Sequence, residues 1–337
     1  MLQTYIRKIV ERQNLTEAES RDAMELIMTG KATDAQIAAY LTGLRLKGET
    51  YEEILGAARV MREKVTRVDA RGRDVIDTCG MGGDGRGTFN VSTVAAFIAA
   101  GAGCRVAKHG NYAVSSLCGS ANVLDSLGVD IRMSRQRIEA ALDAIGIAFL
   151  FAPLLHGAMK FAVGPRREIA IRTIFNILGP LTNPAGACYQ VVGVYEGALV
   201  EPITRVLRDL GARCALVVHG TGGIDEISIA GETLAGEVRN GEMRMRVIRP
   251  EDFGVSASPI ESILGGGVVE NSEIAKRILS GEKGPRRDMA IVNAAAAIYV
   301  AGEAVSLLEG AGLAAESIDS GRAMAKLEAL RTWSRGS

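Results

Sequence analysis

The stretch DTCGMGGDGRGTFN, residues 77–90, gathers residue types that suit the binding of an anion. Five glycines fall within eight residues of it, at positions 80, 82, 83, 85 and 87. Each glycine costs backbone entropy on folding, so a run this dense points to a ligand that the backbone approaches closely. An apolar strand pattern precedes the loop and a helix pattern follows it, and a helix N-terminus favours negative charge. The stretch therefore predicts a phosphate site, with a plain flexible turn as the alternative.

Three kinds of phosphate site compete for this loop. A Walker loop requires GxxxxGK[ST], and no Lys-Ser or Lys-Thr pair follows here. Residues 80–85 match GxGxxG, but a dinucleotide site expects an acidic residue at the end of the next strand. That strand, CRVAK, ends in Lys108. The third possibility is a site for a phosphorylated sugar, in which Lys108 is a second contact to the anion.

Other residues capable of chemistry stand at strand ends and in turns. The three histidines of the chain, His109, His156 and His219, each lie beside a glycine. A lone histidine is more often structural than catalytic, but three histidines beside glycine-rich turns favour a functional site. Asp225 and Glu226 are adjacent. They are either a solvated acidic pair or ligands of Mg²⁺, because this hard cation bridges carboxylates to substrate phosphates.

Composition narrows the class of protein. The chain has 337 residues, 47% hydrophobic and 23% charged, which favours two globular domains. Lys+Arg and Asp+Glu both number 39, so no general attraction to nucleic acid or to an anionic membrane is expected. Five cysteines without a CxxC pair argue against a disulfide framework or a zinc site and favour the cytoplasm. We expect no signal peptide and no membrane span.

Two domains are expected. Residues 1–68 read as about four helices, because three capping boxes mark helix starts at Thr16, Thr33 and Thr50. Residues 69–337 read as an α/β domain with a mostly parallel central sheet, because strands alternate with helices. The segment 153–186, rich in Pro, Gly and Arg, resembles neither a clean helix nor a strand. We expect it to cross between the domains or to pack back on the helical one.

Candidate strands occur at intervals before and after the glycine loop. Residues 236–248 predict a hairpin that turns at Asn240-Gly241. Residues 293–308 predict a buried helix. The other candidate strands lie within residues 68–77, 104–110, 123–131 (a helix followed by a strand), 189–195, 214–220 and 227–231.

Five segments together carry a resemblance: GMGGDGRGTFNVST, KHGNYAVSS, RTIFNILGPLTNPA, DEIS and PEDFG. With them, nearly the whole chain resembles the anthranilate phosphoribosyltransferase family of tryptophan biosynthesis. The resemblance implies transfer of a phosphoribosyl group from phosphoribosyl pyrophosphate to anthranilate, with Mg²⁺. It also implies a small helical domain beside a large α/β domain, as in pyrimidine nucleoside phosphorylases, and a homodimer formed through the helical domain.

The resemblance also implies roles for particular residues. Anthranilate is assigned to Gly80, Asn111 and Arg166, and Mg²⁺ to Ser92, Asp225 and Glu226. No residue is a certain catalyst, because positioning and electrostatics should dominate, with Lys108 and His109 as candidates. Phosphoribosyl pyrophosphate is assigned to Gly80, Gly83, Asp84, Thr88, Asn90, Val91, Ser92, Thr93, Lys108, His109, Gly110, Asn111, Ser115, Ser116 and Ser120.

Several positions depart from the usual family pattern, and they fall around the two expected substrates. They are Met81, Tyr112, Leu117, Cys118 and Gly157, with Gly164-Pro165 before Arg166. The departures indicate either neutral drift or a changed acceptor, such as another aromatic amine. A non-catalytic nucleic-acid-binding relative is a further alternative, but balanced charge and the retained Gly82-Gly83-Asp84 argue against it.

Overall fold

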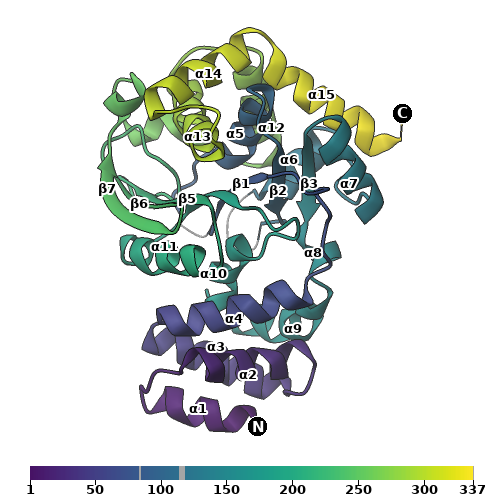
Figure 1. Cartoon of the computed structure of the whole chain (residues 1–337), viewed down its shortest axis with the longest axis vertical. Helices are drawn as coiled ribbons and strands as arrows, with labels where there is room; N and C mark the ends of the chain where they lie inside the picture. The colour runs from purple at the N-terminus through teal and green to yellow at the C-terminus, as the bar shows by residue number, and fades with distance from the viewer. Residues whose placement is uncertain (83–84, 114–117, 337) are drawn as a thin grey trace.

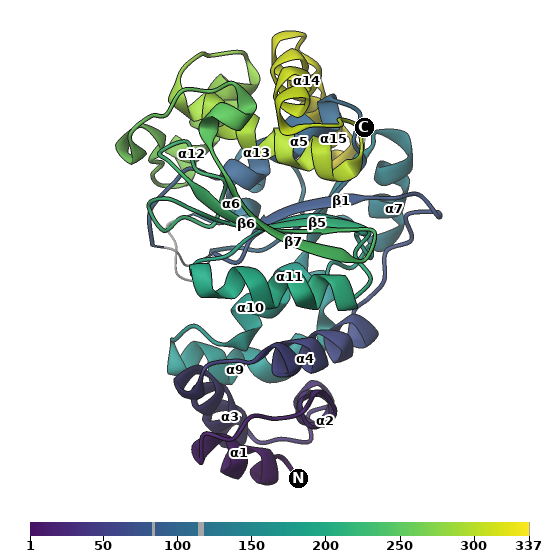
Figure 2. The ribbon, with the colours of Figure 1, turned by 60° about the vertical axis from the view of Figure 1, so that its left-hand side comes forward.

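The computed structural model describes residues 1–82, 85–113 and 118–336. A layer of helices lies at one end of the molecule, and a sheet covered on both faces lies above it (Figure 1, Figure 2). The N-terminus is in the helical layer and the C-terminus is at the opposite end (Figure 1).

Short capped helices form the N-terminal layer. They are α1 (Leu2–Val10), α2 (Glu17–Met28), α3 (Asp34–Lys47) and α4 (Tyr51–Lys64). The three expected capping boxes are confirmed. The hydroxyls of Thr16, Thr33 and Thr50 each accept a hydrogen bond from the backbone N–H three residues on, and the side chain of that later residue accepts one from the threonine backbone N–H. Each box satisfies two backbone donors at a helix start, which explains why helices this short begin where the sequence indicates.

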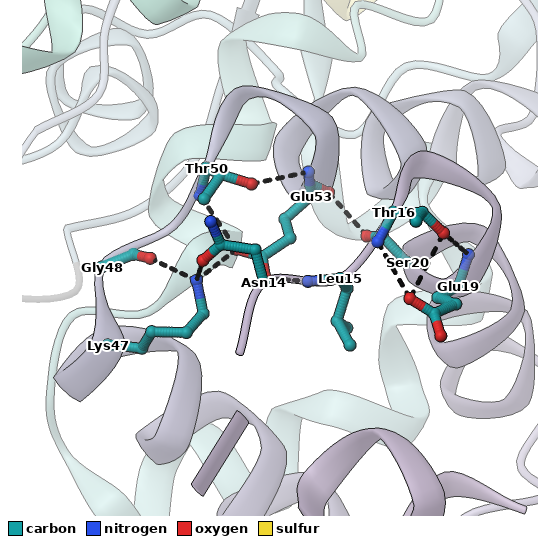
Figure 3. Close-up of polar contacts among 9 residues, drawn as sticks. All are labelled: Asn14, Leu15, Thr16, Glu19, Ser20, Lys47, Gly48, Thr50 and Glu53. Atoms are coloured by element: carbon teal, nitrogen blue, oxygen red, sulfur yellow. Dashed lines mark hydrogen bonds and ion pairs between the residues drawn. The ribbon is translucent and has the colours of Figure 1, made fainter. Parts of the chain in front are cut away.

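The buried carboxylate of Glu53 joins three segments of this layer (Figure 3). Its oxygens accept hydrogen bonds from the backbone N–H groups of Leu15 and Thr50, both at 2.9 Å. They also pair with the Lys47 ammonium at 2.9 Å, and the Lys47 side chain is 5% exposed. Because a charge this buried is tolerated only when it is paired and hydrogen-bonded, Glu53 fixes how the loops before α2 and α4 meet.

A seven-stranded sheet forms the centre of the second layer, in the order β3-β2-β1-β4-β5-β6-β7. Neighbouring strands from β3 to β5 are parallel, and β6 and β7 add to β5 as an antiparallel hairpin. The expected mostly parallel α/β domain is therefore confirmed. The strands are β1 (Ile76–Gly80), β2 (Val106–Gly110), β3 (Ile147–Phe151), β4 (Tyr189–Gly193), β5 (Cys214–Gly220), β6 (Thr233–Arg239) and β7 (Glu242–Ile248).

Helices cover both faces of the sheet (Figure 2). One face carries α5 (Val91–Gly101), α12 (Val268–Leu279), α13 (Pro285–Ala301), α14 (Leu307–Asp319) and α15 (Arg322–Arg335), with α6 (Ser120–Ser126) and α7 (Arg135–Ala144) toward the β3 edge. The other face carries α10 (Ile174–Leu181) and α11 (Val200–Asp209). On that side one hydrophobic cluster continues from the sheet into the N-terminal helices. The helical layer therefore shares a core with the sheet.

Two side chains of α4, Arg62 and Tyr51, hold this helix against the sheet side. The Arg62 guanidinium donates to the carbonyls of Leu181 at 2.6 Å and Leu210 at 2.9 Å, which closes the C-terminal ends of α10 and α11. The Tyr51 hydroxyl donates to the Asp209 carboxylate, and the Arg205 guanidinium lies 3.9 Å from the Tyr51 ring centroid. Carbonyls at helix ends lack a partner within the helix, so the two Arg62 hydrogen bonds also satisfy the ends of α10 and α11.

The predicted hairpin is confirmed, while two strand expectations are wrong. Arg239 pairs with Glu242, and both Asn240 and Gly241 have positive φ, as a two-residue hairpin turn requires. Residues 227–231 and 129–131 form no strand. The strand β3 was not anticipated, since its run IAFLF is apolar throughout and lacks the alternation that marks a half-buried strand.

The segment 153–186 is more helical than expected. It contains most of α8 (Ala152–Leu155), all of α9 (Lys160–Ile169) and α10. Pro165 and Pro180 lie inside α9 and α10, and such prolines obscure a helical pattern because they remove a backbone donor. α9 packs against α2 and α3, so part of this segment joins the helical layer. The domain boundaries at 68 and 69 stay a prediction.

All five cysteines lie in described parts of the chain, and each is a free thiol. Among residues 1–82, 85–113 and 118–336, no helix combines the length and the apolarity that crossing a bilayer requires.

Candidate active site

A small cavity opens at the carboxyl ends of β1, β4 and β5. The strand order reverses direction at β1, whose sequence neighbour β2 lies on one side and β4 on the other. Ligands of open α/β sheets bind at this kind of switch point. The cavity is lined by Thr78, Cys79, Gly80, Ser92, Ala95, Val191, Gly193, Val218, Asp225, Glu226 and Asn293.

The three residues assigned to Mg²⁺ meet in this cavity. Ser92 lies in the first turn of α5, and Asp225 and Glu226 follow β5, yet all three line the same space. The Asp225 carboxylate, 6% exposed, accepts a hydrogen bond from the Gly82 N–H at 2.7 Å. Their hydroxyl and carboxylate oxygens are the ligand types that a hard cation takes.

The glycines of this site allow backbone and carboxylate to approach closely. A Cβ atom at Gly80 would lie 2.2 Å from Asp225 Oδ2, and one at Gly193 would lie 1.5 Å from the Asp225 carbonyl oxygen. Neither separation is possible for real atoms, so a side chain at either position would displace Asp225. The glycine run thus serves the acidic residues as well as an anion.

Lys108, in β2, lies beside β1 and the first turn of α5, where its ammonium is held by two oxygen atoms. Nζ donates to the Thr78 carbonyl at 2.7 Å and to the Ser92 hydroxyl at 3.2 Å. Burial lowers the pKa of Lys108, and the negative charge of Asp77 opposes that fall. An ammonium has three N–H donors, and two of them are used within the described part of the chain, which leaves the third for a ligand.

A buried network under Lys108 was not anticipated from the sequence. Asp77 Oδ1 accepts from the His109 N–H at 3.1 Å, and Oδ2 accepts from Asn183 Nδ2 at 2.8 Å. The ladder between β1 and β2 is recorded at Ile76 and Val106, whereas β1 pairs with β4 along its whole length. The Asp77 side chain therefore joins β1 to β2 beyond the point at which their backbones pair.

His109 and His156 form a neutral buried pair. Their Nε2 atoms lie 3.1 Å apart. In the neutral pair one Nε2 carries a proton and donates it, and the other Nε2 accepts. Burial lowers the pKa of His109 to about 3 and that of His156 to about 4. As the pH falls below 6.5, these histidines bind protons in the unfolded chain but stay neutral in the folded protein. The free energy of unfolding therefore falls as the pH is lowered from 6.5 toward the folded pKa values.

The loop between β1 and α5 carries residues assigned to the phosphoribosyl donor; its described residues, 81–82 and 85–90, are named the donor loop, and they lead directly into the N-terminus of α5. Asn90 is the N-cap residue and makes no side-chain cap hydrogen bond, and Val91, Ser92 and Thr93 form the first turn. This places the assigned residues where helix N–H groups and the dipole favour an anion. Thr88 pairs with Leu264, and Ser120 opens α6 beside Gly110. The remaining assigned residues Gly83, Asp84, Ser115 and Ser116, and the departure Leu117, lie outside the described residues.

The residues assigned to anthranilate lie on different elements. Asn111 is exposed after β2. Arg166 lies in α9, half-buried, with its guanidinium 5.2 Å from the Phe175 ring centroid. Burial lowers the pKa of Arg166. Within the described ranges, no recorded hydrogen bond or ion pair joins Arg166 to Asn111, so their shared role stays a prediction.

The departures from the family pattern have definite surroundings. Met81 is buried in the hydrophobic cluster that reaches the helical layer. The Tyr112 hydroxyl accepts from Arg132 Nη2 at 3.0 Å, and its ring packs edge-on against Phe151. The Cys118 carbonyl accepts from Asn90 Nδ2 at 3.1 Å. Gly157 begins a short 3₁₀ turn next to His156.

Comparison with known families defines the class of protein. Residues 3–65 match the helical bundle domain of a glycosyl transferase family, and residues 72–324 match the α/β domain of the glycosyl transferase family. The chain therefore has the two domains of a glycosyl transferase with an N-terminal helical bundle.

Individual relatives narrow the class further. Anthranilate phosphoribosyltransferase of Pelotomaculum thermopropionicum is 54% identical over 98% of this chain and 96% of its own length. That of Geobacter sulfurreducens is 54% identical over 98% of this chain and 99% of its own. The chain belongs to the anthranilate phosphoribosyltransferase family.

Solved structures agree in fold. Anthranilate phosphoribosyltransferase from Thermus thermophilus superposes with a TM-score of 0.92 at 41% identity, covering 98% of this chain and 99% of its own. The Saccharomyces cerevisiae enzyme in complex with PRPP and Mg has a TM-score of 0.90 at 27% identity, covering 100% of this chain and 98% of its own.

Proposed function

We propose that this chain transfers the phosphoribosyl group of phosphoribosyl pyrophosphate to anthranilate, releasing pyrophosphate, as a step of tryptophan biosynthesis. The observation that carries the proposal is the cavity in which Ser92, Asp225 and Glu226 meet at the switch point of the sheet. The names of relatives that are 54% identical support the same reaction, and the yeast complex with PRPP and Mg supports the donor and the metal.

The donor is held along β1, the loop after it and the start of α5. Gly80 brings backbone to the ligand, and the first turn of α5 presents N–H groups to the phosphates. Lys108 supplies an ammonium from the β2 side. The other contacts are assigned to Gly83, Asp84, Thr88, Asn90, His109, Gly110, Asn111, Ser115, Ser116 and Ser120.

The residues present fit Mg²⁺. Asp225, Glu226 and Ser92 offer only oxygen ligands, and they line one cavity with Gly80. Among the residues that the structure describes, no group of three or more His, Cys, Asp or Glu side chains is placed to hold a metal. A cation here would thus take further ligands from substrate phosphates, as Mg²⁺ commonly does. When bound, it stabilises the negative charge of the leaving pyrophosphate.

Positioning accounts for the rest of the reaction. Positive charge grows on the sugar ring while pyrophosphate leaves, and Lys108 with the α5 N-terminus stabilises the leaving group. The anthranilate amine is neutral at pH 7 and needs no strong base. Asn111 and Gly80 orient the amine, and the planar guanidinium of Arg166 suits the carboxylate. Holding both substrates in register supplies the remaining rate enhancement.

Phosphoribosyl transfer to anthranilate, measured beside a panel of aromatic amines, tests the function. We expect activity on anthranilate that depends on Mg²⁺ and on phosphoribosyl pyrophosphate. Activity confined to an amine that lacks a carboxylate would instead identify a paralogue with another acceptor. Tight DNA binding without binding of phosphoribosyl pyrophosphate would favour the non-catalytic alternative.

A homodimer through the helical layer is the proposed assembly, and the cytoplasm is the proposed compartment. Val10 on α1 and Leu46 on α3 are 70% and 75% exposed, and large apolar side chains left in water suit a covered face. The five free thiols support a reducing compartment.

Light scattering is expected to give twice the 35.6 kDa mass of one chain. Leu46→Asp should shift the mass toward the monomer, because a charge would then be buried at the contact. Val305→Asp is the matched control, since Val305 is 89% exposed and lies in the α/β domain, far from the helical layer. A monomer mass across micromolar concentrations of the wild type would contradict the dimer.

A further inference from the structure

The amide of Asn271, in α12, is buried and fixed in orientation. Its Oδ1 accepts from the Gly266 N–H at 2.8 Å, and its Nδ2 donates to Asn90 Oδ1 at 3.0 Å. A backbone N–H can only donate, so the Gly266 contact decides which end of the Asn271 amide is oxygen. The Asn271 atom that faces Asn90 is therefore Nδ2, which donates, and Asn90 must present Oδ1 as the acceptor.

The orientation passes on through Asn90. With Oδ1 turned to Asn271, Asn90 Nδ2 donates to the Cys118 carbonyl at 3.1 Å. Cys118 stands just before Gly119 and Ser120, where α6 begins. Three segments that are distant in sequence are thus joined by one chain of directional hydrogen bonds. They are the loop before α5, the entry to α6, and α12, which packs beside α6 (Figure 1).

The segment before α12 also contacts the donor loop directly. Gly265 N–H donates to the Gly87 carbonyl at 2.8 Å, and Thr88 bridges to Leu264. A Cβ atom at Gly265 would lie 2.3 Å from Asn271 Oδ1 and 2.7 Å from the Phe89 Cα. The Arg286 guanidinium donates to the Leu264 carbonyl, with Nη2 at 2.8 Å. The donor loop is therefore braced by a segment from the C-terminal third of the chain.

We propose that Asn271 is a positioning residue for phosphoribosyl pyrophosphate. It acts through Asn90, by fixing the Asn90 amide and with it the distance between the donor loop and the entry to α6. Both segments carry residues assigned to the donor, so this proposal rests on the proposed function. The anthranilate carboxylate is assigned to Arg166 in α9, outside this chain of hydrogen bonds, so anthranilate binding should depend much less on Asn271 than donor binding does.

Asn271→Asp tests the proposal with an almost unchanged shape. The variant has no N–H to donate, and it places a carboxylate oxygen against Asn90 Oδ1. We expect the dissociation constant of phosphoribosyl pyrophosphate with Mg²⁺, measured by calorimetry, to rise about tenfold or more, because two linked hydrogen bonds lose their geometry. The KM for anthranilate and kcat at saturating donor should stay within about threefold, since the reacting groups are untouched.

Ser272→Ala is the matched control. Ser272 is the next residue of α12, also buried, and its hydroxyl donates to the Val268 carbonyl within the helix at 2.7 Å. The Ser272→Ala variant should have a lower melting temperature than the wild type but the same affinity for phosphoribosyl pyrophosphate. If Asn271→Asp does not fold, Asn271→Ser carries the same expectation without an added charge.

Two outcomes would overturn the proposal. One is a folded Asn271→Asp protein with donor affinity within twofold of the wild type. The other is an equal loss of donor and anthranilate affinity that Ser272→Ala reproduces, which would reduce Asn271 to a structural role. Failure of the wild type itself to bind phosphoribosyl pyrophosphate is a separate result, because it refutes the proposed function before any variant is compared.

Discussion

Replacing Asp225 with Asn and Glu226 with Gln is expected to lower turnover at limiting Mg²⁺ by about tenfold or more, since charge-assisted contacts are worth about 1.5–3 kcal/mol each. Both side chains line the cavity with Ser92. Neutral amide oxygens hold a divalent cation more weakly than carboxylates do, so the cation binds less tightly and the leaving pyrophosphate is less stabilised. Excess Mg²⁺ should partly restore turnover. Initial rates across a Mg²⁺ titration provide the measurement.

The amide substitutions preserve shape, so the loss should reflect charge. Asn at position 225 retains an oxygen that can accept from the Gly82 N–H, as Asp225 does now. Glu251→Gln with Asp252→Asn makes the same chemical change at two adjacent exposed carboxylates away from the cavity, and should leave the Mg²⁺ dependence intact. Unchanged activity of the Asp225 and Glu226 variant at limiting Mg²⁺ would remove these residues from the metal site.

Arg166→Ala is expected to raise the KM for anthranilate roughly thirty- to hundredfold. A charged hydrogen-bond partner of a desolvated carboxylate is worth about 2–3 kcal/mol, and each 1.4 kcal/mol is about tenfold in affinity. The guanidinium is half-buried over Phe175, so it is already partly desolvated before anthranilate binds. The KM for phosphoribosyl pyrophosphate should change little. Steady-state kinetics with each substrate varied in turn separates the two effects.

The chain supplies its own controls for this prediction. Arg167 is the exposed neighbour of Arg166 in α9, and Arg167→Ala should leave both Michaelis constants unchanged. Tyr112→Arg, which restores the residue usual in the family, should act mainly on the donor. Intact anthranilate kinetics in Arg166→Ala would mean that the acceptor is held elsewhere. A wild type active only on an amine without a carboxylate would mean that the departures at Tyr112 and Leu117 mark a new specificity.

The sequence by itself determined the features that depend on local chemistry. Capping boxes require only residues three apart, so the starts of α2, α3 and α4 were predictable from Thr16, Thr33 and Thr50. The hairpin turn at Asn240-Gly241 was predictable because few residues tolerate positive φ. The glycine loop followed by a helix likewise indicated an anion site, since glycine density is a local property. Motifs spread along the chain indicated the anthranilate phosphoribosyltransferase family.

Tertiary structure alone decided how these pieces meet. β3 is apolar on both faces, so no alternation marked it, and α9 and α10 contain prolines that hid their helical pattern. Asp77 with Asn183, and Asn271 with Asn90, are separated by more than a hundred residues in sequence. Nothing local distinguishes such an Asn from one on the surface. The role of such an Asn is set by the partner that folding brings within hydrogen-bond distance. Burying an amide costs free energy unless its donors and acceptors are hydrogen-bonded, so only the tertiary structure decides where a buried Asn is tolerated.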